Sequence, residues 1–443
     1  MRPLWIIAVL LAGCAHRREV GGEDLHEALG FVEAVHPAPA MIDLEAARAA
    51  VQAEASRRDP TAEPRFEERV RGAQALAGAL GDAHIVVGTP PRELQGIVPV
   101  LPVLLEGRVY VDAFVHELPR GTLLRSIEGR PAMDWLDELG ALTSVDGGRA
   151  EVRRALAVRA FASLLVRHSG PRAVWSIETE SPDGEVRTWT VDGLDFEGAR
   201  ALAEAGESPW PTWEETTDED TVHLRLPSFG SPEVEAWSAR LDAGFAELRG
   251  DETIVVDLRG NAGGNRALGV LVARKLLDRP FAQWSSVSTR VRAIPRKYRD
   301  RVDFPFGPEE ALTGFPGTRV EGDPLAPTMQ PVDRPHTGPV VLFVDDATNS
   351  AAIELAVALL AFHDDIKVVG TPTQGACDRH TGQLPVTFEL GDGVVLMMSL
   401  FEIELVPTPG CVAGSGLPID VPVVPTLEGW LAGEDPWWTA WAG

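Results

Sequence analysis

The segment Val256-Asp-Leu-Arg-Gly-Asn-Ala-Gly-Gly264 is the most informative stretch of the chain. It closes an apolar run that predicts a strand over 253–257, and it leads into a predicted helix over 266–278. Glycines allow a sharp turn and leave backbone amides uncovered. Uncovered amides beside a helix N-terminus can bind an anion or an oxyanion, although a generic strand-to-helix turn is an equal alternative. No Gly-Lys-Ser/Thr follows, which excludes the phosphate loop of nucleotide enzymes.

A second strand-to-helix turn follows in Val344-Asp-Asp-Ala-Thr-Asn-Ser-Ala-Ala352. Ser350 stands where the predicted helix over 350–362 begins, and a helix dipole stabilises negative charge that develops there. The amide of Ala351 could then serve an oxyanion. Serine is also a common helix N-cap, and for this segment alone capping is the favoured interpretation.

A third candidate is His84 in Gly81-Asp-Ala-His84, between a predicted helix and the β-like run over 85–87. A histidine on such a loop can reach a site that is formed elsewhere in the fold, but a lone histidine is more often an ordinary core or surface residue. Of the other nine histidines, His380 is the strongest rival because it follows Gly375 on a loop.

Around these segments, the chain alternates between β and α patterns. Helical periodicity covers about 23–80, ending at Gly81. Short β-like runs occupy 93–195 around a helical patch over 149–167. From residue 220, predicted strands over 222–226, 253–257, 339–344, 366–369 and 394–405 alternate with helices, and 279–336 is an extended excursion. This order predicts a layered α/β core. Four tryptophans near the C-terminus, Trp430, Trp437, Trp438 and Trp441, favour a strap docked on the body over an interface.

Composition limits the function. The chain has 443 residues, 44% of them hydrophobic, which is enough for more than one core. Its formal net charge of −26 disfavours binding to nucleic acid or to anionic lipid head groups. Only Lys275, Lys297 and Lys367 are lysines. There is no Cys-x-x-Cys pair, so a cysteine-rich zinc site is excluded.

The N-terminus predicts export. The apolar run over 4–12 follows Arg2 and is too short for a membrane-spanning helix. Leu11-Ala12-Gly13-Cys14 resembles the bacterial lipobox, in which the cysteine is acylated, and an ordinary signal peptide is the alternative. Residues 1–22 are therefore interpreted as a lipoprotein signal and tether. In an oxidising compartment Cys377 and Cys411 could form a disulfide, which we favour slightly over two separate buried thiols.

Together these segments resemble the tail-specific serine proteases, which include the C-terminal processing proteases and the tricorn core proteases. The motif Asp-Leu-Arg-Gly-Asn-x-Gly-Gly is close to diagnostic for that family. Thr348-x-Ser350-Ala351 matches the nucleophile segment, and Val369-Gly-Thr-Pro-Thr-Gln-Gly375 matches the loop that follows it. Gly414-x-Gly416-x-Pro418 resembles the closing stretch imperfectly, and the sequence over 118–129 looks like the PDZ-like module.

The resemblance implies a ClpP/crotonase-like core of stacked β-β-α units. It implies an N-terminal helical region over 23–92, a PDZ-like module over 93–195 and a protease core over 196–443. Ser350 matches the nucleophile and His84 matches the general base of the tricorn-like branch. Gly263 or Gly264, together with Ala351, would supply the oxyanion amides. No metal or cofactor is implied.

Several positions depart from the family. The processing proteases use a Ser–Lys dyad, but the matching position is Ala376, and Lys367 lies too close to Ser350 in the sequence. The tricorn-like branch adds a serine beside the histidine and a glutamate near the closing glycines, where this chain has Ala83 and Ala413. The family acid after the nucleophile is displaced to Glu354. Candidates for orienting His84 are Asp82, Glu402 and Glu404.

Two functions follow from this comparison. The favoured one is a lipid-anchored extracytoplasmic serine endopeptidase that acts on peptides or unfolded chains, with the outer membrane as the favoured location. The alternative is a catalytically weak or inactive lipoprotein that binds a peptide or another ligand on the same fold, because the same fold carries retinoid-binding modules.

Overall fold

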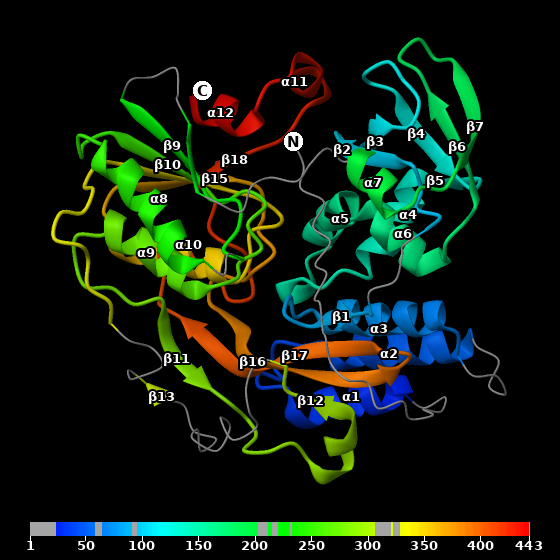
Figure 1. Cartoon of the computed structure of the whole chain (residues 1–443), viewed down its shortest axis with the longest axis horizontal. Helices are drawn as coiled ribbons and strands as arrows, with labels where there is room; N and C mark the ends of the chain where they lie inside the picture. Colours follow the sequence, from blue (N-terminus) through cyan, green and yellow to red (C-terminus); the bar gives the residue numbers. More distant parts are fainter. Residues whose placement is uncertain are drawn as a thin grey trace.

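The computed structural model describes residues 24–57, 64–90, 95–202, 211–214, 220–230, 233–305, 320–321 and 328–442. The leader over 1–22, with Cys14, lies outside the described residues. The strands form three sheets that helices cover (Figure 1). This mixed α/β architecture confirms the fold class expected from the sequence. Within the described ranges, no helix is both long enough and apolar enough to cross a membrane.

The first sheet is mainly parallel and runs in the order β18-β15-β14-β10-β9-β8. Its strands are β8 (Thr212–Glu214), β9 (Thr221–Arg225), β10 (Thr253–Asp257), β14 (Val340–Val344), β15 (Ile366–Gly370) and β18 (Val421–Pro422). The helices α8 (Val234–Ala246), α9 (Arg266–Leu276) and α10 (Ala351–Phe362) connect them and pack on one face. The central strands β10 and β14 are almost entirely buried, and they are rich in apolar residues because both of their faces are covered.

The register of the parallel strands places three turns at one edge of this sheet. Val256 of β10 lies opposite Leu342 of β14, and Val344 lies opposite Gly370 of β15. The carboxyl ends of parallel strands meet at the same edge, where ligands bind in open α/β sheets. The glycine turn after β10, the turn before Ser350 and the loop after β15 are therefore neighbours in space.

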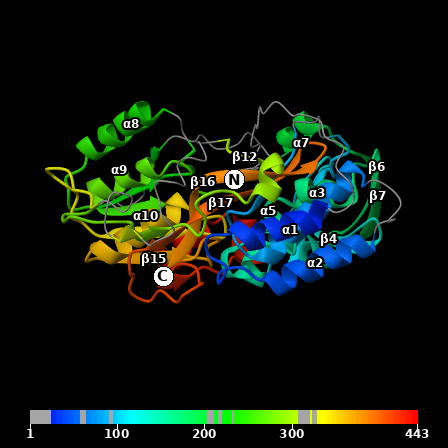
Figure 2. The same cartoon turned by 90° about the horizontal axis from the view of Figure 1, so that it is seen from below.

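The second sheet is antiparallel, in the order β12-β16-β17-β11-β13, with β1 paired to β17. Its strands are β1 (Val86–Gly88), β11 (Trp284–Ser288), β12 (Val302–Asp303), β13 (Val320–Glu321), β16 (Arg379–Gly391) and β17 (Val394–Leu405). Figure 2 shows β16 and β17 between α8–α10 and the N-terminal helices. The sequence did not predict β16. Gly382 and Pro385 interrupt its pattern, and the register with β17 shifts between them.

The N-terminal helices are α1 (Asp24–Val35), α2 (Leu44–Ser56) and α3 (Phe66–Leu80). The side chain of Asp43 caps α2 by accepting from Ala46 N at 2.8 Å. Gly81 ends α3 in the left-handed conformation (φ 76°), which glycine adopts without strain. The apolar faces of these helices join the same core cluster as β16 and β17, so they fix the loop that follows Gly81 against the second sheet.

The third sheet has the order β2-β3-β4-β6-β7, with β5 paired to β4, and its own hydrophobic core. The strands are β2 (Val100–Leu105), β3 (Arg108–Phe114), β4 (Leu123–Ile127), β5 (Arg130–Pro131), β6 (Val174–Glu180) and β7 (Val186–Asp192). Its helices are α4 (Ala132–Gly140), α5 (Ala150–Arg159), α6 (Phe161–Ser169) and α7 (Phe196–Leu202), with the short 3-10 helix η1 (Asp146–Gly148) before α5. A second 3-10 helix, η2 (Arg296–Arg301), precedes β12 of the second sheet. The helical patch expected over 149–167 consists of two helices that meet at Ala160, whose φ of −100° and ψ of 15° are not helical. The PDZ-like assignment of this region stays a prediction.

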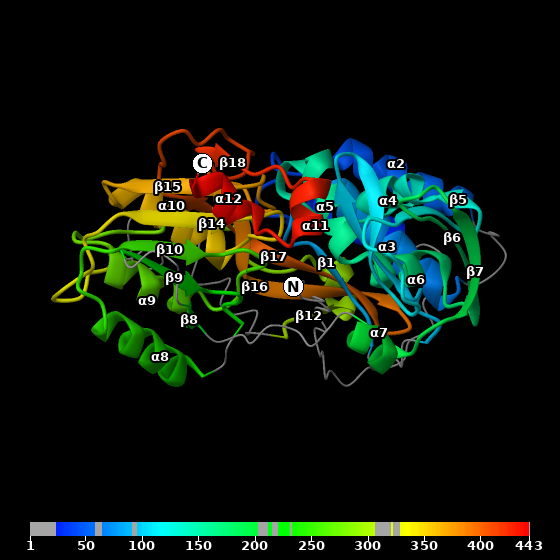
Figure 3. The ribbon, with the colours of Figure 1, turned by 90° about the horizontal axis from the view of Figure 1, so that it is seen from above.

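The C-terminal strap comprises α11 (Leu427–Ala432) and α12 (Pro436–Ala442). On α12, Trp437 and Trp438 pack against Phe343 on the face of the first sheet opposite α9 and α10. On α11, Trp430 packs beside Tyr110 of the third sheet, with ring centroids 6.5 Å apart. Figure 3 shows the two helices over these two sheets. The strap interpretation of the tryptophan-rich tail is confirmed, and the strap joins the two layers.

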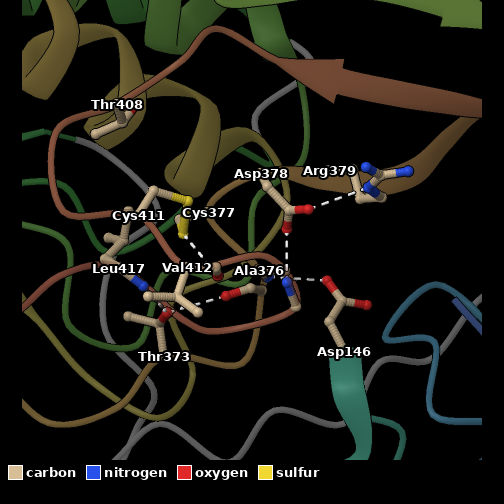
Figure 4. Close-up of a disulfide and its surroundings, with 12 residues drawn as sticks. Asp146, Thr373, Ala376, Cys377, Asp378, Arg379, Thr408, Cys411, Val412 and Leu417 are labelled. Atoms are coloured by element: carbon tan, nitrogen blue, oxygen red, sulfur yellow. Dashed lines mark hydrogen bonds and ion pairs between the residues drawn. A yellow bond between two sulfur atoms is a disulfide. The ribbon is translucent and has the colours of Figure 1, made fainter.

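Cys377 and Cys411 form a disulfide with Cα atoms 5.9 Å apart (Figure 4). Around it, Cys377 N donates to Ser415 O at 2.9 Å, and Gly414 N donates to Asp378 Oδ1 at 2.9 Å. The loop after β15 is thereby tied to the closing glycine-rich segment, which holds Ala376 close to the candidate site.

Candidate active site

Ser350 stands in the turn between β14 and α10 with φ 51° and ψ −124°. A residue with a side chain is strained in this region, and such strain clusters at functional sites. Its side chain makes no capping hydrogen bond to α10. The capping interpretation, which the sequence favoured for this segment alone, is therefore wrong, and the hydroxyl is not committed to the helix terminus.

The glycine turn packs directly against Ser350. Gly263 has φ 93°, and a Cβ atom placed on it would lie 2.6 Å from the Cβ of Ser350 and 2.9 Å from Ala351 N. Only glycine permits this approach. Gly264, at φ 130°, packs instead on the backbone of Phe229, where a Cβ would lie 2.4 Å from the carbonyl oxygen. The two glycines thus have different contacts.

Backbone amides beside Ser350 are available to bind an oxyanion. The amide of Gly263 is already used, because it donates to Asn261 Oδ1 at 2.9 Å. Among the described residues, the amides of Gly264 and Ala351 have no hydrogen-bond acceptor. Of the two glycines that the sequence offered for this role, Gly264 is the one with a free amide.

Hydrogen bonds lock the glycine turn to the nucleophile turn. Asn349 N donates to Asn261 O at 3.1 Å, and Thr348 Oγ1 donates to Leu258 O at 3.1 Å. Gly260 N donates to Asp345 Oδ1 at 3.0 Å. These bonds make the two turns one rigid unit, which suits a site that must hold its donors in place.

His84 lies on the loop between α3 and β1, and 17% of its side chain is exposed. Its backbone N–H donates to Asp82 Oδ1 at 2.8 Å, and its Nδ1 lies 3.9 Å from the same oxygen. Neither ring nitrogen has a hydrogen-bond partner among the described residues, so no bond joins it to Ser350. The ring stacks on His380 with centroids 5.0 Å apart and an interplanar angle of 18°.

His380 is a buried partner that the sequence ranked only as a rival base. Its Nδ1 lies 2.6 Å from Thr381 O, and its Nε2 lies 3.1 Å from Glu354 Oε1. Both partners are acceptors, so both ring nitrogens carry hydrogen and the ring is an imidazolium. Burial opposes this charge, but the hydrogen bond and charge of Glu354 outweigh it and raise the pKa of His380.

Glu354 connects this pair to the nucleophile. It lies one turn along α10, where its N–H donates to Ser350 O at 3.0 Å. Its second carboxylate oxygen lies 3.2 Å from Arg266 Nε. The displaced acid that the sequence noted thus binds His380, and neither of the two histidines is isolated.

The charge state of His84 follows from these neighbours. Burial, with the positive charge of His380, lowers the pKa of His84 to about 4, although Asp82 and Glu354 act in the opposite direction. His84 is therefore neutral at pH 7, which is the state that a general base requires.

Asp82 is buried and holds the His84 loop through its hydrogen bonds. It accepts from Thr381 Oγ1 at 2.9 Å and lies 2.9 Å from His36 Nε2. Burial would raise the pKa of Asp82, but His36 and His84 outweigh it and lower the pKa to about 2. Asp82 is thus the carboxylate beside His84. The other two candidates have different partners, since Glu402 pairs with Arg379 and Glu404 accepts from Ser286.

Asp146 joins the loop from the other side and was not singled out in the sequence. It accepts from Ala83 N at 2.8 Å and from Ala376 N at 3.0 Å. Burial and the negative charge of Asp82 raise the pKa of Asp146 to about 6. No local pattern marks Asp146 or His36, since their partners are distant in sequence.

Within the described ranges, Asp82, His84 and Asp146 form the group that could hold a metal ion, because one ligand atom from each lies within 4.8 Å of the others. The oxygens of both carboxylates already accept hydrogen bonds from protein donors. The two carboxylates therefore hold the loop that carries His84 in place.

The chain can now be compared with known proteins. Residues 220–410 match the peptidase family S41. These residues are thus similar to the peptidase domain of that family. The chain is thus a serine-type peptidase, and the matched range holds Ser350, both glycines and His380, whereas His84 precedes it.

Two solved structures share the fold of this chain, and a third is less similar. The structure of mature CPAF complexed with lactacystin is 16% identical, has a TM-score of 0.63 and covers 92% of this chain and 94% of that chain. Mature CPAF alone has a TM-score of 0.62 at 16% identity and covers 92% and 93%. The photosystem II D1 C-terminal processing protease has a TM-score of 0.41 at 15% identity and covers 92% and 94%. No curated relative matches the chain by sequence.

The three lysines of the chain have other contacts or are exposed. Lys275 pairs with Asp242 at 2.5 Å, and Lys297 lies 4.4 Å from the ring centroid of Tyr298. Lys367 is exposed near the start of β15. Ala376, at the position where the processing proteases have lysine, donates its amide to Asp146. No lysine therefore stands at the position of the Ser–Lys dyad.

Proposed function

We propose that this chain is an extracytoplasmic serine endopeptidase in which Ser350 is the nucleophile and His84 the general base. The observation that carries the proposal is the strained Ser350 packed against Gly263 at the N-terminus of α10. The neutral state of His84 and the free amides of Gly264 and Ala351 support it.

The reaction follows from these groups. Ser350 Oγ attacks the peptide carbonyl carbon and its proton passes to His84, while the amides of Gly264 and Ala351 stabilise the oxyanion. The C–N bond then breaks as His84 returns the proton to the leaving amine, which leaves an acyl-enzyme. Water attacks that ester, gives its proton to His84, and releases the acid with Ser350 restored. Asp82, ionised and 3.9 Å from Nδ1, is proposed to orient His84 and stabilise its protonated form.

Export and lipid anchoring are part of the proposal. The lipobox-like sequence at Cys14 motivates the anchor, and the Cys377–Cys411 disulfide supports an oxidising compartment. Substrates would be peptides or unfolded chains, and the region over 93–195 could recruit them as a PDZ-like module by strand addition. Metabolic labelling with palmitate should depend on Cys14, and labelling that persists in Cys14→Ala would contradict this anchor.

One observation favours the alternative, a catalytically weak or inactive binding lipoprotein. His84 makes no hydrogen bond to Ser350, and its low pKa makes it a weak base. In the peptidase, closure on substrate must bring the two side chains into reach.

A fluorophosphonate probe separates the two functions. We expect wild type to form a covalent adduct that Ser350→Ala abolishes and that Ser285→Ala, a substitution on β11, retains. Peptide hydrolysis should fall by at least about 10³-fold in Ser350→Ala. An adduct that is absent from wild type, or independent of Ser350, would favour the binding protein.

A further inference from the structure

One segment of this acidic chain is strongly basic. Over 290–301, six of twelve residues are arginine or lysine and one is acidic, whereas the whole chain has 40 basic and 66 acidic residues. Exposed charges more than about 10 Å apart are largely screened at about 0.1 M salt. A partner that touches this segment therefore responds to its local charge more than to the net charge of the chain.

The fold turns most of these cations outward. In the 3-10 helix η2, residues three apart lie on the same side, and Tyr298 and Arg301 share the side that faces α1. The ring of Tyr298 is buried against Phe31 and Phe388, and Ile294 before the helix is buried as well. The exposed cations of the segment are Arg290, Arg292, Arg296, Lys297 and Arg299.

Three of these exposed cations carry charge that no carboxylate of the described chain neutralises. Within the described ranges, Arg296 and Lys297 form no ion pair. Arg290 donates from Nη1 to the carbonyl oxygen of Glu33 at 2.9 Å, and the carboxylate of Glu33 is itself paired with Arg48 at 2.6 Å. Together the three side chains present positive charge to solvent, which attracts a negatively charged surface.

The basic segment is fixed to the start of α1. Arg301 Nη2 lies 2.9 Å from Asp24 Oδ1, Nη1 is bound by Glu27, and Nε donates to Glu389 O at 3.0 Å. Asp24 follows Cys14 by ten residues, and a chain of that length spans at most about 36 Å. An acyl group on Cys14 would therefore keep the membrane within reach of the basic segment.

We propose that the basic segment over 290–301 is a docking surface for the anionic head groups of the membrane that holds the lipid anchor. This inference rests on the anchor proposed at Cys14 and adds a second attachment to it. A basic patch beside an acyl anchor strengthens membrane binding, because each cation near anionic lipid contributes separately. Two attachments also fix the orientation of the body, which a tether alone does not.

Vesicle sedimentation tests the docking surface. The parent chain is Cys14→Ala, which cannot be acylated, and the vesicles are phosphatidylcholine or an equal mixture of phosphatidylcholine and phosphatidylglycerol. Each cation at an anionic surface contributes about fivefold to the partition coefficient. Arg290→Gln, Arg296→Gln and Lys297→Gln together should therefore lower binding to the mixed vesicles by about 10²-fold and leave binding to phosphatidylcholine unchanged. The leader is common to all variants, so its contribution cancels.

A second triple variant is the matched control. Arg108→Gln, Arg125→Gln and Arg187→Gln remove the same charge from exposed positions of the third sheet, and they should change binding by less than about twofold. Raising the salt to about 1 M shortens the screening length to about 3 Å and should release the parent chain from the mixed vesicles. Thermal unfolding of both triple variants checks that they are folded like the parent.

The outcomes separate the docking surface from the anchor. Equal binding of the parent to both kinds of vesicle, or equal losses in the two triple variants, would overturn the docking surface. Tighter binding of the same three side chains to double-stranded DNA would overturn it as well, because the occupant would then be a nucleic acid. Palmitate labelling that persists in Cys14→Ala contradicts the anchor alone, whatever the vesicles show.

Discussion

Gly263 illustrates how a single missing side chain shapes the site. Its φ of 93° and its close approach to Ser350 both require glycine. The neighbouring Gly264 is required for another reason, because it packs on the backbone of Phe229. The motif that contains both was recognisable in the sequence. Which glycine touches the nucleophile and which keeps a free amide depends on the side chain of Asn261, whose position only the folded turn defines.

At this scale we predict that Gly263→Ala lowers kcat by about 10²-fold to 10³-fold. The added Cβ would lie 2.6 Å from the Cβ of Ser350, so the nucleophile must move away from the oxyanion donors. Steady-state peptide hydrolysis measures the effect. The control is Gly140→Ala, where the nearest atoms lie at an ordinary 3.5 Å, and a similar loss in both variants would refute the explanation.

His380→Gln should change the pH dependence of catalysis. His84 acts as a base only when neutral, so activity falls as pH drops through its pKa of about 4. Removal of the neighbouring positive charge raises that pKa, and the acidic limb of kcat/KM should move up by about one pH unit or more. His363→Gln, at the end of α10, should leave the limb in place. An unchanged limb in His380→Gln would show that His380 does not tune His84.

Among the elements, α12 was predicted from its tryptophan content and not from a periodic pattern. The tryptophan concentration predicted a docked strap, and the helix covers the face of the first sheet that α9 and α10 leave open. In contrast, β16 was missed because a strand that carries Gly382 and Pro385 has no continuous apolar pattern of its own. Its pairing with β17 forms it, and that pairing is tertiary.

Trp437→Ala should therefore destabilise the fold by about 2 kcal/mol. The ring packs with Phe343 and Val423, its Nε1 donates to Val344 O at 3.0 Å, and the ring remains partly exposed, so the loss falls below that of a fully buried tryptophan. Denaturant unfolding measures the change. Thr439→Ala on the exposed side of α12 should cost well under half as much, and equal losses would contradict docking through Trp437.

At the scale of the whole molecule, the third sheet and its helices meet the peptidase core through buried polar contacts. Arg159 at the end of α5 binds Asp345 and Asp346 in the turn before Ser350, and Arg149 donates to Gln374 O at 2.9 Å. Asp345 in turn accepts from Gly260 N in the glycine turn. The contact between the two layers is therefore also part of the support of the site.

Arg159→Met should lower the free energy of unfolding by about 3–5 kcal/mol, because it leaves the buried Asp345 without its cation. Activity should fall as well, since Asp345 holds the glycine turn. The matched control is Arg154→Met on the same helix, which breaks an exposed pair with Asp137 and should cost at most about 1 kcal/mol. Urea unfolding of both variants checks the prediction, and comparable losses would contradict it.

The sequence by itself determined the α/β core and the turns that carry chemistry. The apolar runs of β10 and β14 identify buried parallel strands, and parallel strands bring the turns after them to one edge. The tertiary structure alone decided what surrounds His84. Asp82 meets His36 across 46 residues and Thr381 across 299, and the stacking of His84 on His380 joins α3 to β16. Such contacts leave no periodic trace in the sequence, because they depend on how separate elements pack and not on the conformation of any one of them.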